Sequence, residues 1–158
     1  MDNGARIRLS TTIVLFIIGV ILIFFALAAD ELGLDRTPGF GMIQMFLFLV
    51  GITSLTLGAF VHLRGLQHRK GKSLQASIGT RLAATGLIFA YAAGLADLLS
   101  IGTHPHPDFG RPFVGWLQLF GISIGIASIL LGILLYYTSR RIRESSSMEF
   151  IANGNGGE

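Results

Sequence analysis

The chain has no cysteine, only four prolines in 158 residues, and few charges: Asp, Glu, Lys and Arg make up 13% of its residues. A soluble domain carries about 25% charged residues. The lack of cysteine excludes disulfides, thiolate metal sites and iron–sulfur clusters. Apolar residues make up 51% of the chain, and its mean hydropathy is +0.65. This composition is typical of an integral membrane protein.

The charged residues are clustered, so long uncharged stretches lie between them. A helix needs roughly 20 apolar residues to cross a bilayer core of about 30 Å. Residues 11–29, 37–63 and 112–139 meet this requirement, and 82–96 meets it if Asp97 lies near the headgroups. We therefore expect an all-α, polytopic transmembrane domain over residues 1–143, followed by a flexible cytoplasmic tail at 144–158. Its four helices are expected at about residues 10–29, 38–63, 79–100 and 112–138.

The first stretch has an alternative interpretation as a cleaved signal peptide. Arg6 and Arg8 would form its basic region, and Ala26-Leu27-Ala28 fits the small-residue cleavage pattern. The apolar run from Thr11 is long for a signal peptide, which favours a retained helix. The sequence alone leaves retention or cleavage open.

The distribution of Lys and Arg predicts the orientation of the chain. Cytoplasmic loops of membrane proteins carry an excess of these residues. Of the 12 basic residues, only Arg36 and Arg111 fall in the two loops predicted to lie outside. The others precede the first helix, lie between the second and third, or follow the fourth: Arg6, Arg8, Arg64, Arg69, Lys70, Lys72, Arg81, Arg140, Arg141 and Arg143. Both termini should therefore be cytoplasmic, and the strong bias suggests a bacterial inner membrane.

Two apolar segments of the chain closely resemble one another. GITSLTLGAF starts at residue 51 and GIASILLGIL starts 74 positions later. The shared spacing of Gln, Gly, Ser and Gly joins Gln44, Gly51, Ser54 and Gly58 to Gln118, Gly125, Ser128 and Gly132. Each copy also includes the preceding helix and a Pro/Phe-Gly loop. We interpret this as a duplication of a two-helix hairpin, which predicts two tandem parallel repeats about an axis along the membrane normal.

The repeated small residues predict surfaces where helices pack closely. Lipid is as apolar as leucine, so helices associate in membranes mainly through close van der Waals contact between small residues. Gly121 extends the fourth-helix stripe at helical spacing, and the expected packing residues are Gly51, Ser54, Gly58, Gly121, Gly125, Ser128 and Gly132. Their partners could be helices of the same chain or of another subunit.

Three polar residues near the predicted outer membrane surface form a possible polar site. Gln44 and Gln118 occupy equivalent positions in the two copies, where they could hydrogen-bond across the pseudo-two-fold axis or touch a ligand. Asp97 follows the third helix, and a carboxylate next to a membrane segment is a candidate for proton or cation handling. A headgroup-level charge is the alternative for Asp97.

One loop carries residue types that bind metals. His104, His106 and Asp108 alternate with prolines, and two imidazoles with a carboxylate could hold Zn²⁺ or Cu²⁺. The alternative is a structural loop at the membrane surface. No cofactor is expected, because no histidine lies in the middle of a predicted helix to ligate haem and no nucleotide-binding motif occurs.

The element Pro38-Gly39-Phe40, followed by an apolar helix containing Gly51-Ile-Thr-Ser-Leu-Thr-Leu-Gly58, resembles the small membrane subunit of tripartite tricarboxylate transporters. That family has four helices and a similar length. Gly41-Met42 stands where the family has Phe-Pro. The resemblance implies an accessory role and assigns none to individual residues.

These patterns predict a small, non-catalytic membrane protein that serves as an accessory or assembly subunit of a larger complex. Its partners would be the lipid bilayer and other membrane subunits, or further copies of itself, and not nucleic acid. A small transporter or channel component is the alternative. A metal-binding membrane enzyme that uses the histidine loop is a third interpretation.

Overall fold

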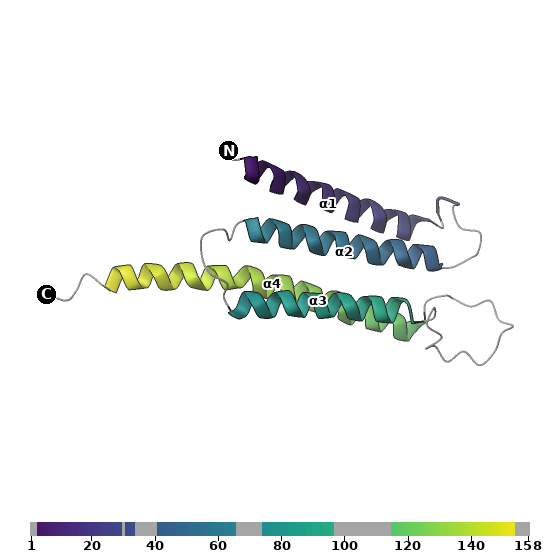
Figure 1. Ribbon diagram of the computed structural model, residues 1–158. Helices are drawn as coiled ribbons and strands as arrows, with labels where there is room; N and C mark the ends of the chain where they lie inside the picture. Colours follow the sequence, from purple (N-terminus) through teal and green to yellow (C-terminus); the bar gives the residue numbers. More distant parts are fainter. Residues whose placement is uncertain (1–2, 30, 34–40, 66–73, 97–114, 154–158) are drawn as a thin grey trace.

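The computed structural model describes residues 3–29, 31–33, 41–65, 74–96 and 115–153, with side chains up to Ser139 in the last segment. All regular structure in these residues is helical: α1 (Asn3–Ala28), α2 (Met42–Gly65), α3 (Leu74–Gly94) and α4 (Trp116–Asn153). Successive helices run in opposite directions (Figure 1). The start of α1 and the end of α4 therefore lie at the same end of the molecule, as the end of α2 and the start of α3 do.

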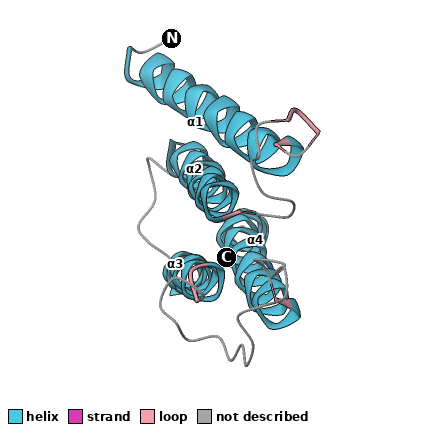
Figure 2. Ribbon diagram, turned by 90° about the vertical axis from the view of Figure 1, so that its right-hand side faces the viewer, coloured by secondary structure: helices cyan, strands magenta, loops and turns pink. Residues whose placement is uncertain are grey.

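The helices form two closely packed pairs. α1 packs along α2, and α3 packs along α4, whereas α2 makes the few contacts that join the pairs. Viewed along the helices, α1 is at one edge, next to α2, and α3 and α4 lie on the other side of α2 (Figure 2). α1 therefore has one helical neighbour among the described helices.

Two small clusters connect α2 to the α3–α4 pair. Met45 and Leu49 of α2 pack with Ala90 and Ile122. At the other end, Leu63 packs with Ala76 and Tyr136, and the Phe60 ring meets the Tyr136 ring edge-on with their centroids 5.5 Å apart. These contacts lie near the two ends of α2.

Among the described residues, three helical segments are long and apolar enough to cross a membrane: α1, α2 and the Trp116–Ser139 part of α4. Within them, backbone polar groups are paired along the helix, as a bilayer requires. Large apolar side chains cover much of the exposed surface, among them Phe24 and Phe120. The composition and the helices together indicate a membrane protein.

The helix bounds differ from those predicted. α1 begins earlier, at Asn3, because residues before the apolar run continue the helix without an interruption. α2 begins at Met42, after the non-helical Gly41, and residues 38–40 of the predicted helix lie outside the described part of the chain. α3 covers Leu74–Gly94 where residues 79–100 were expected, and residues 97–100 lie outside the described part of the chain.

The largest difference concerns α4, which begins at Trp116 and continues to Asn153, beyond the predicted end at residue 138. Residues 144–153, predicted as a flexible tail, are helical. The segment after Ser139 contains no Gly or Pro before Gly154. Extending an existing helix costs much less than nucleating one, so ordinary helix-forming residues can continue it into water.

Candidate functional site

The closest helix approach in the described chain joins α3 and α4. A Cβ atom added to Gly125 would lie 2.8 Å from the Ala90 Cβ and 2.8 Å from the Gly86 carbonyl oxygen. At Gly132, the added atom would lie 2.5 Å from the Gly79 carbonyl oxygen and 2.6 Å from a backbone nitrogen of α3. Real Cβ atoms essentially never approach other atoms this closely, so only glycine fits at these positions.

The matching surface on α3 is a stripe of small residues that was not among the predicted packing residues. The buried residues of α3 are all small and recur at intervals of three or four positions: Ala76, Gly79, Ala83, Gly86, Ala90 and Gly94. A side chain on Gly86 would lie 2.6 Å from the Gly125 oxygen and 2.7 Å from the Ser128 Cβ. The signal was present as small residues at heptad spacing, which places them along one helix face.

α1 and α2 meet in a similar but shorter contact. A side chain on Gly51 would lie 2.6 Å from the Ile23 Cγ1 and 3.0 Å from the Gly19 carbonyl oxygen. A side chain on Gly19 would in turn lie 2.9 Å from the Gly51 oxygen. The contact is looser at Gly58, where the nearest atom, the Leu15 Cβ, is 3.4 Å away. The tight approach on α2 is therefore centred on Gly51.

Most of the residues expected to pack helices therefore face a helix of their own chain. Gly121 completes the set on α4, since its added Cβ would lie 2.7 Å from the Ala93 Cβ. Ser54 is half-buried on α2. The atoms nearest to these positions belong to another helix of the same chain at Gly51, Gly58, Gly121, Gly125 and Gly132, and the Ser128 Cβ lies close to Gly86.

Gln44 and Gln118 have the same structural role in the two helix pairs. The Gly41 amide donates a hydrogen bond of 2.6 Å to the Gln44 Oε1, and the Gly115 amide donates one of 2.9 Å to the Gln118 Oε1. Each glutamine is the third residue of its helix and caps the residue just before that helix, as in a capping box. Both side chains are buried. Their oxygen atoms therefore bond within the local chain and not across a pseudo-two-fold axis.

The nitrogen of one of these amides has no partner. The Gln118 Nε2 is buried without a hydrogen bond, and the Gln118 side chain as a whole is 8% exposed. An unsatisfied buried donor costs about 1–3 kcal/mol. Gln44 Nε2 is not in this situation. The two equivalent glutamines therefore differ in one respect, which the sequence did not predict.

Side-chain hydrogen bonds join neighbouring helices in the described part of the chain. Thr53 and Tyr91 join α2 to α3 with their hydroxyl oxygens 3.0 Å apart, and the Gln75 Nε2 donates to the Thr138 hydroxyl at 3.3 Å between α3 and α4. Thr53 also donates to the Leu49 carbonyl at 2.8 Å. Because the Thr53 proton is used there, Tyr91 is the donor in the bond to Thr53.

The remaining candidates lie outside the described residues. These are Asp97 of the possible polar site and His104, His106 and Asp108 of the possible metal site. Within the described part of the chain, no three His, Asp or Glu residues come together in a way that could hold a metal ion. The metal and proton interpretations of these four residues remain predictions.

Comparisons with known proteins identify no relative of this chain. No protein-family model, no curated protein and no solved structure matches the chain. The likeness to the small subunit of tripartite tricarboxylate transporters therefore receives no support from them.

Proposed function

We propose that this protein is a non-catalytic accessory or assembly subunit of a larger membrane complex. The observation that carries the proposal is the position of α1. Its most apolar 18-residue window is 11% buried inside the chain, against 44% for the corresponding window of α2. α1 is also the most apolar of the three candidate spans. It is thus held at the edge of the molecule by one neighbour, with most of its surface free for contacts outside the chain.

The free side of α1 is built from large side chains. Successive helical residues are rotated by about 100°, which puts Ile17, Ile21 and Phe24 opposite Gly19, the residue that touches α2. Phe24 is 60% exposed. Lipid tails can cover such a face, and so can an apolar helix of another subunit. We assign this face of α1 to contact with a larger membrane protein. The small residues of α2, α3 and α4 already pack against helices of the same chain, so they leave no comparable surface for a partner.

We further propose that the two helix pairs are copies of one ancestral hairpin. The copies align at an offset of 67 positions between α1 and α3 and of 74 between α2 and α4. At these offsets Gly19 corresponds to Gly86, and Gly51 to Gly125. The contacts correspond too: an added Cβ lies 3.0 Å from the Gly19 oxygen at Gly51, and 2.8 Å from the Gly86 oxygen at Gly125. This agreement in helix register is independent of the residue matches that first suggested the repeat.

The proposal includes α3 as a fourth transmembrane helix. Its 21 residues would measure about 32 Å at 1.5 Å per residue, enough to cross a bilayer core. Arg81 is exposed on its side. Arg81 is the eighth residue of α3, about 10 Å from its start, and a long arginine side chain can extend its charged group toward the headgroups while its stem stays in lipid. Both termini would then be cytoplasmic, in the inner membrane of a bacterium.

The experiment that tests the proposed function is a purification from native membranes. The tagged chain is captured after mild solubilisation, and the proteins recovered with it are quantified by mass spectrometry. We expect larger membrane proteins in a fixed molar ratio to the chain. Phe24→Ala should reduce that recovery, whereas Phe120→Ala, a matched exposed phenylalanine on α4, should leave it unchanged. Recovery of the chain alone, or only with copies of itself, would contradict the proposal.

A small transporter or channel component is the alternative function, and one observation favours it. The unpaired Gln118 Nε2 is a buried donor near the start of α4, where a polar solute could supply the missing acceptor. Solute flux in proteoliposomes containing only this protein, lost in Gln118→Leu and retained in Gln44→Leu, would support this function. Absence of flux across a panel of small anions and polar solutes would exclude transport of these classes by the chain alone.

A further inference from the structure

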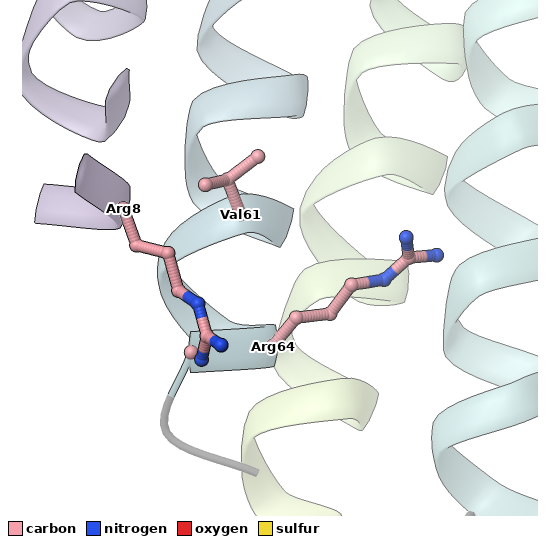
Figure 3. A pocket seen from close by; sticks show the side chains of 4 residues that line it. Arg8, Val61 and Arg64 are labelled. Carbon is pink, nitrogen blue, oxygen red and sulfur yellow. The ribbon is translucent and has the colours of Figure 1, made fainter. Parts of the chain in front are cut away.

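A cavity of about 320 Å³ lies between α1 and α2, at the end where α1 begins and α2 ends. It is lined by Arg8 of α1 and by Val61, Arg64 and Gly65 of α2 (Figure 3). Its volume falls at the lower end of the range of ligand pockets, about 300–1,000 Å³. Two arginines from different helices thus share one cavity with an apolar wall.

Gly65 makes room for one of the two arginines. A Cβ atom added to Gly65 would meet only the Arg8 Cδ, at 3.6 Å, so the aliphatic stem of Arg8 lies across the end of α2. In Figure 3 the guanidinium of Arg8 lies beside the last turn of α2, and the Arg64 side chain extends away from it. The Arg8 guanidinium therefore lies at the cavity, whereas the Arg64 guanidinium points away from Arg8 and reaches a ligand there only after its side chain turns.

The positive charge of this cavity is uncompensated by the helices that form it. Neither α1 nor α2 contains an Asp or Glu residue. In the described part of the chain, no hydrogen bond or ion pair engages the guanidinium group of Arg8 or Arg64. A guanidinium group has five N–H donors in a fixed planar arrangement that matches the oxygens of a phosphate or carboxylate. The cavity thus offers two unused anion-binding groups.

The location of the cavity indicates which kind of anion could bind there. Arg8 precedes the apolar run of α1, and Arg64 follows that of α2, so both lie where membrane-spanning helices leave the hydrocarbon core. Val61 and the exposed apolar residues of α1 continue from the cavity along the two helices. A ligand with a phosphate at one end and acyl chains at the other matches this sequence of charged and apolar surfaces.

We propose that this cavity is a phosphate-binding site, occupied by the headgroup phosphate of an anionic phospholipid whose acyl chains lie along α1 and α2. Arg8 binds the phosphate oxygens from its present position, Arg64 binds them after its exposed side chain turns toward the cavity, and Gly65 keeps the space beside Arg8 open. The site is independent of the proposed accessory function, because it requires no other protein.

The test measures retention of phosphatidylglycerol and of phosphatidylcholine by the purified full-length chain, using native mass spectrometry. We expect wild-type protein to retain phosphatidylglycerol preferentially. Arg8→Gln and Arg64→Gln should each weaken retention about tenfold, because each removes charged hydrogen bonds to the phosphate. Arg6→Gln is the matched control: Arg6 is an arginine of the same helix that does not line the cavity, and its removal should change retention less than twofold.

A pair of glycine variants tests the cavity separately from its charge. Gly65→Leu fills the space between the arginines and should also reduce retention, although both charges remain. Gly4→Leu, near the same end of α1 and with no atom within 4 Å, should not. An equal loss in Arg6→Gln, or full retention in Gly65→Leu, would overturn the site in favour of diffuse attraction to the membrane. Thermal stabilisation by inorganic phosphate without lipid retention would overturn the lipid assignment.

Discussion

At the scale of single residues, the glycines of this protein act through their size. Gly125 and Gly132 sit in helices, where glycine is unfavourable by about 1 kcal/mol relative to alanine. Their contacts explain why the chain accepts this cost: at both positions an added Cβ would be within 3 Å of atoms of α3. Close backbone approach then supplies the packing energy that burial from water supplies in soluble proteins.

The variant Gly125→Leu should destabilise the protein strongly. The new side chain would have to displace Ala90 and the backbone around Gly86, and overpacking of this kind costs at least about 2 kcal/mol. Gly58→Leu should cost less, because the nearest atom there is 3.4 Å away. Reversible unfolding in detergent measures both. A loss in Gly4→Leu, where the space is open, as large as that in Gly125→Leu would contradict this explanation.

The two capping glutamines should differ when each is replaced by leucine. Gln44→Leu removes a helix cap and should cost about 1 kcal/mol. Gln118→Leu removes an equivalent cap but also a buried donor without a partner, so its net cost should be smaller. Free energies of unfolding, measured under identical detergent conditions, make the comparison. A larger loss for Gln118→Leu would show that its Nε2 has a partner in the membrane-embedded protein.

The capping role illustrates what residue patterns can and cannot predict. The spacing that gives it, Gly-x-x-Gln before an apolar helix, was present in the sequence at Gly41 and Gly115. The matching positions of the two glutamines are visible in the sequence, but the partners considered for them were a bond across the predicted pseudo-two-fold axis or a ligand. A polar residue in a mostly apolar segment suggests a partner on another helix. The actual donor for each glutamine is a backbone amide three residues earlier, that of Gly41 or Gly115.

At the scale of helices, the α3–α4 interface follows a heptad pattern on both sides. The buried residues of α4 recur every three or four positions: Gln118, Ile122, Gly125, Ile129, Gly132, Tyr136 and Ser139. A repeat of 3.5 residues keeps one face in contact over many turns when two helices cross at a small angle. Since the facing residues of α3 are all Ala or Gly, the two backbones come close along this length.

The contact between the two helix pairs is slighter, and one hydrogen bond in it can be measured. Tyr91 of α3 donates to Thr53 of α2. A double-mutant cycle with Tyr91→Phe and Thr53→Val should give a coupling energy of about 0.6 kcal/mol, the average for such bonds between membrane helices. Gln75 and Thr138, paired between α3 and α4, provide a second cycle for comparison. A Tyr91–Thr53 coupling of zero would mean that the two pairs do not hold this arrangement in the membrane.

The elements themselves were predictable to different degrees. The uncharged runs predicted four helices that cross a membrane, and three of the described helices are long and apolar enough to do so. Length and hydropathy are sufficient evidence for such helices. The face that α3 uses was missed because alanine is common on every side of a membrane helix, and only its spacing with glycine marks the contact. The end of α4 was missed because residues after Arg143 are polar, a feature that reports exposure to water and not the loss of helix.

At the scale of the whole molecule, the absence of cysteine makes the topology directly testable. Single cysteines can be introduced at Ala5, Glu31 and Gln75 without any background of native thiols. In intact bacterial spheroplasts, a membrane-impermeant maleimide should label Glu31→Cys and should label Ala5→Cys and Gln75→Cys only after permeabilisation. Labelling of Ala5→Cys without permeabilisation would reverse the proposed orientation. Labelling of all three without permeabilisation would contradict a spanning arrangement of α1.

The arrangement of the whole chain gives α1 its central place in the account. α2 is covered on two sides, and α3 and α4 cover one another, but α1 contacts α2 alone among the described helices. No pattern in the sequence predicted this difference, because α1 and α2 are both long and apolar. The difference arises because helices pack closely only where both carry small residues that face each other. The buried residues of α1 are Gly19 and Ala26.

The most direct test of the accessory-subunit proposal is site-specific photo-crosslinking from α1 in native membranes. A photoreactive amino acid at Phe24 faces away from α2, whereas the same group at Gly58 of α2 faces α1 and serves as the internal control. The account predicts that position 24 forms a discrete adduct with a larger membrane protein, and that position 58 forms adducts only within the chain. Adducts of position 24 with lipid or with copies of this chain alone would contradict it.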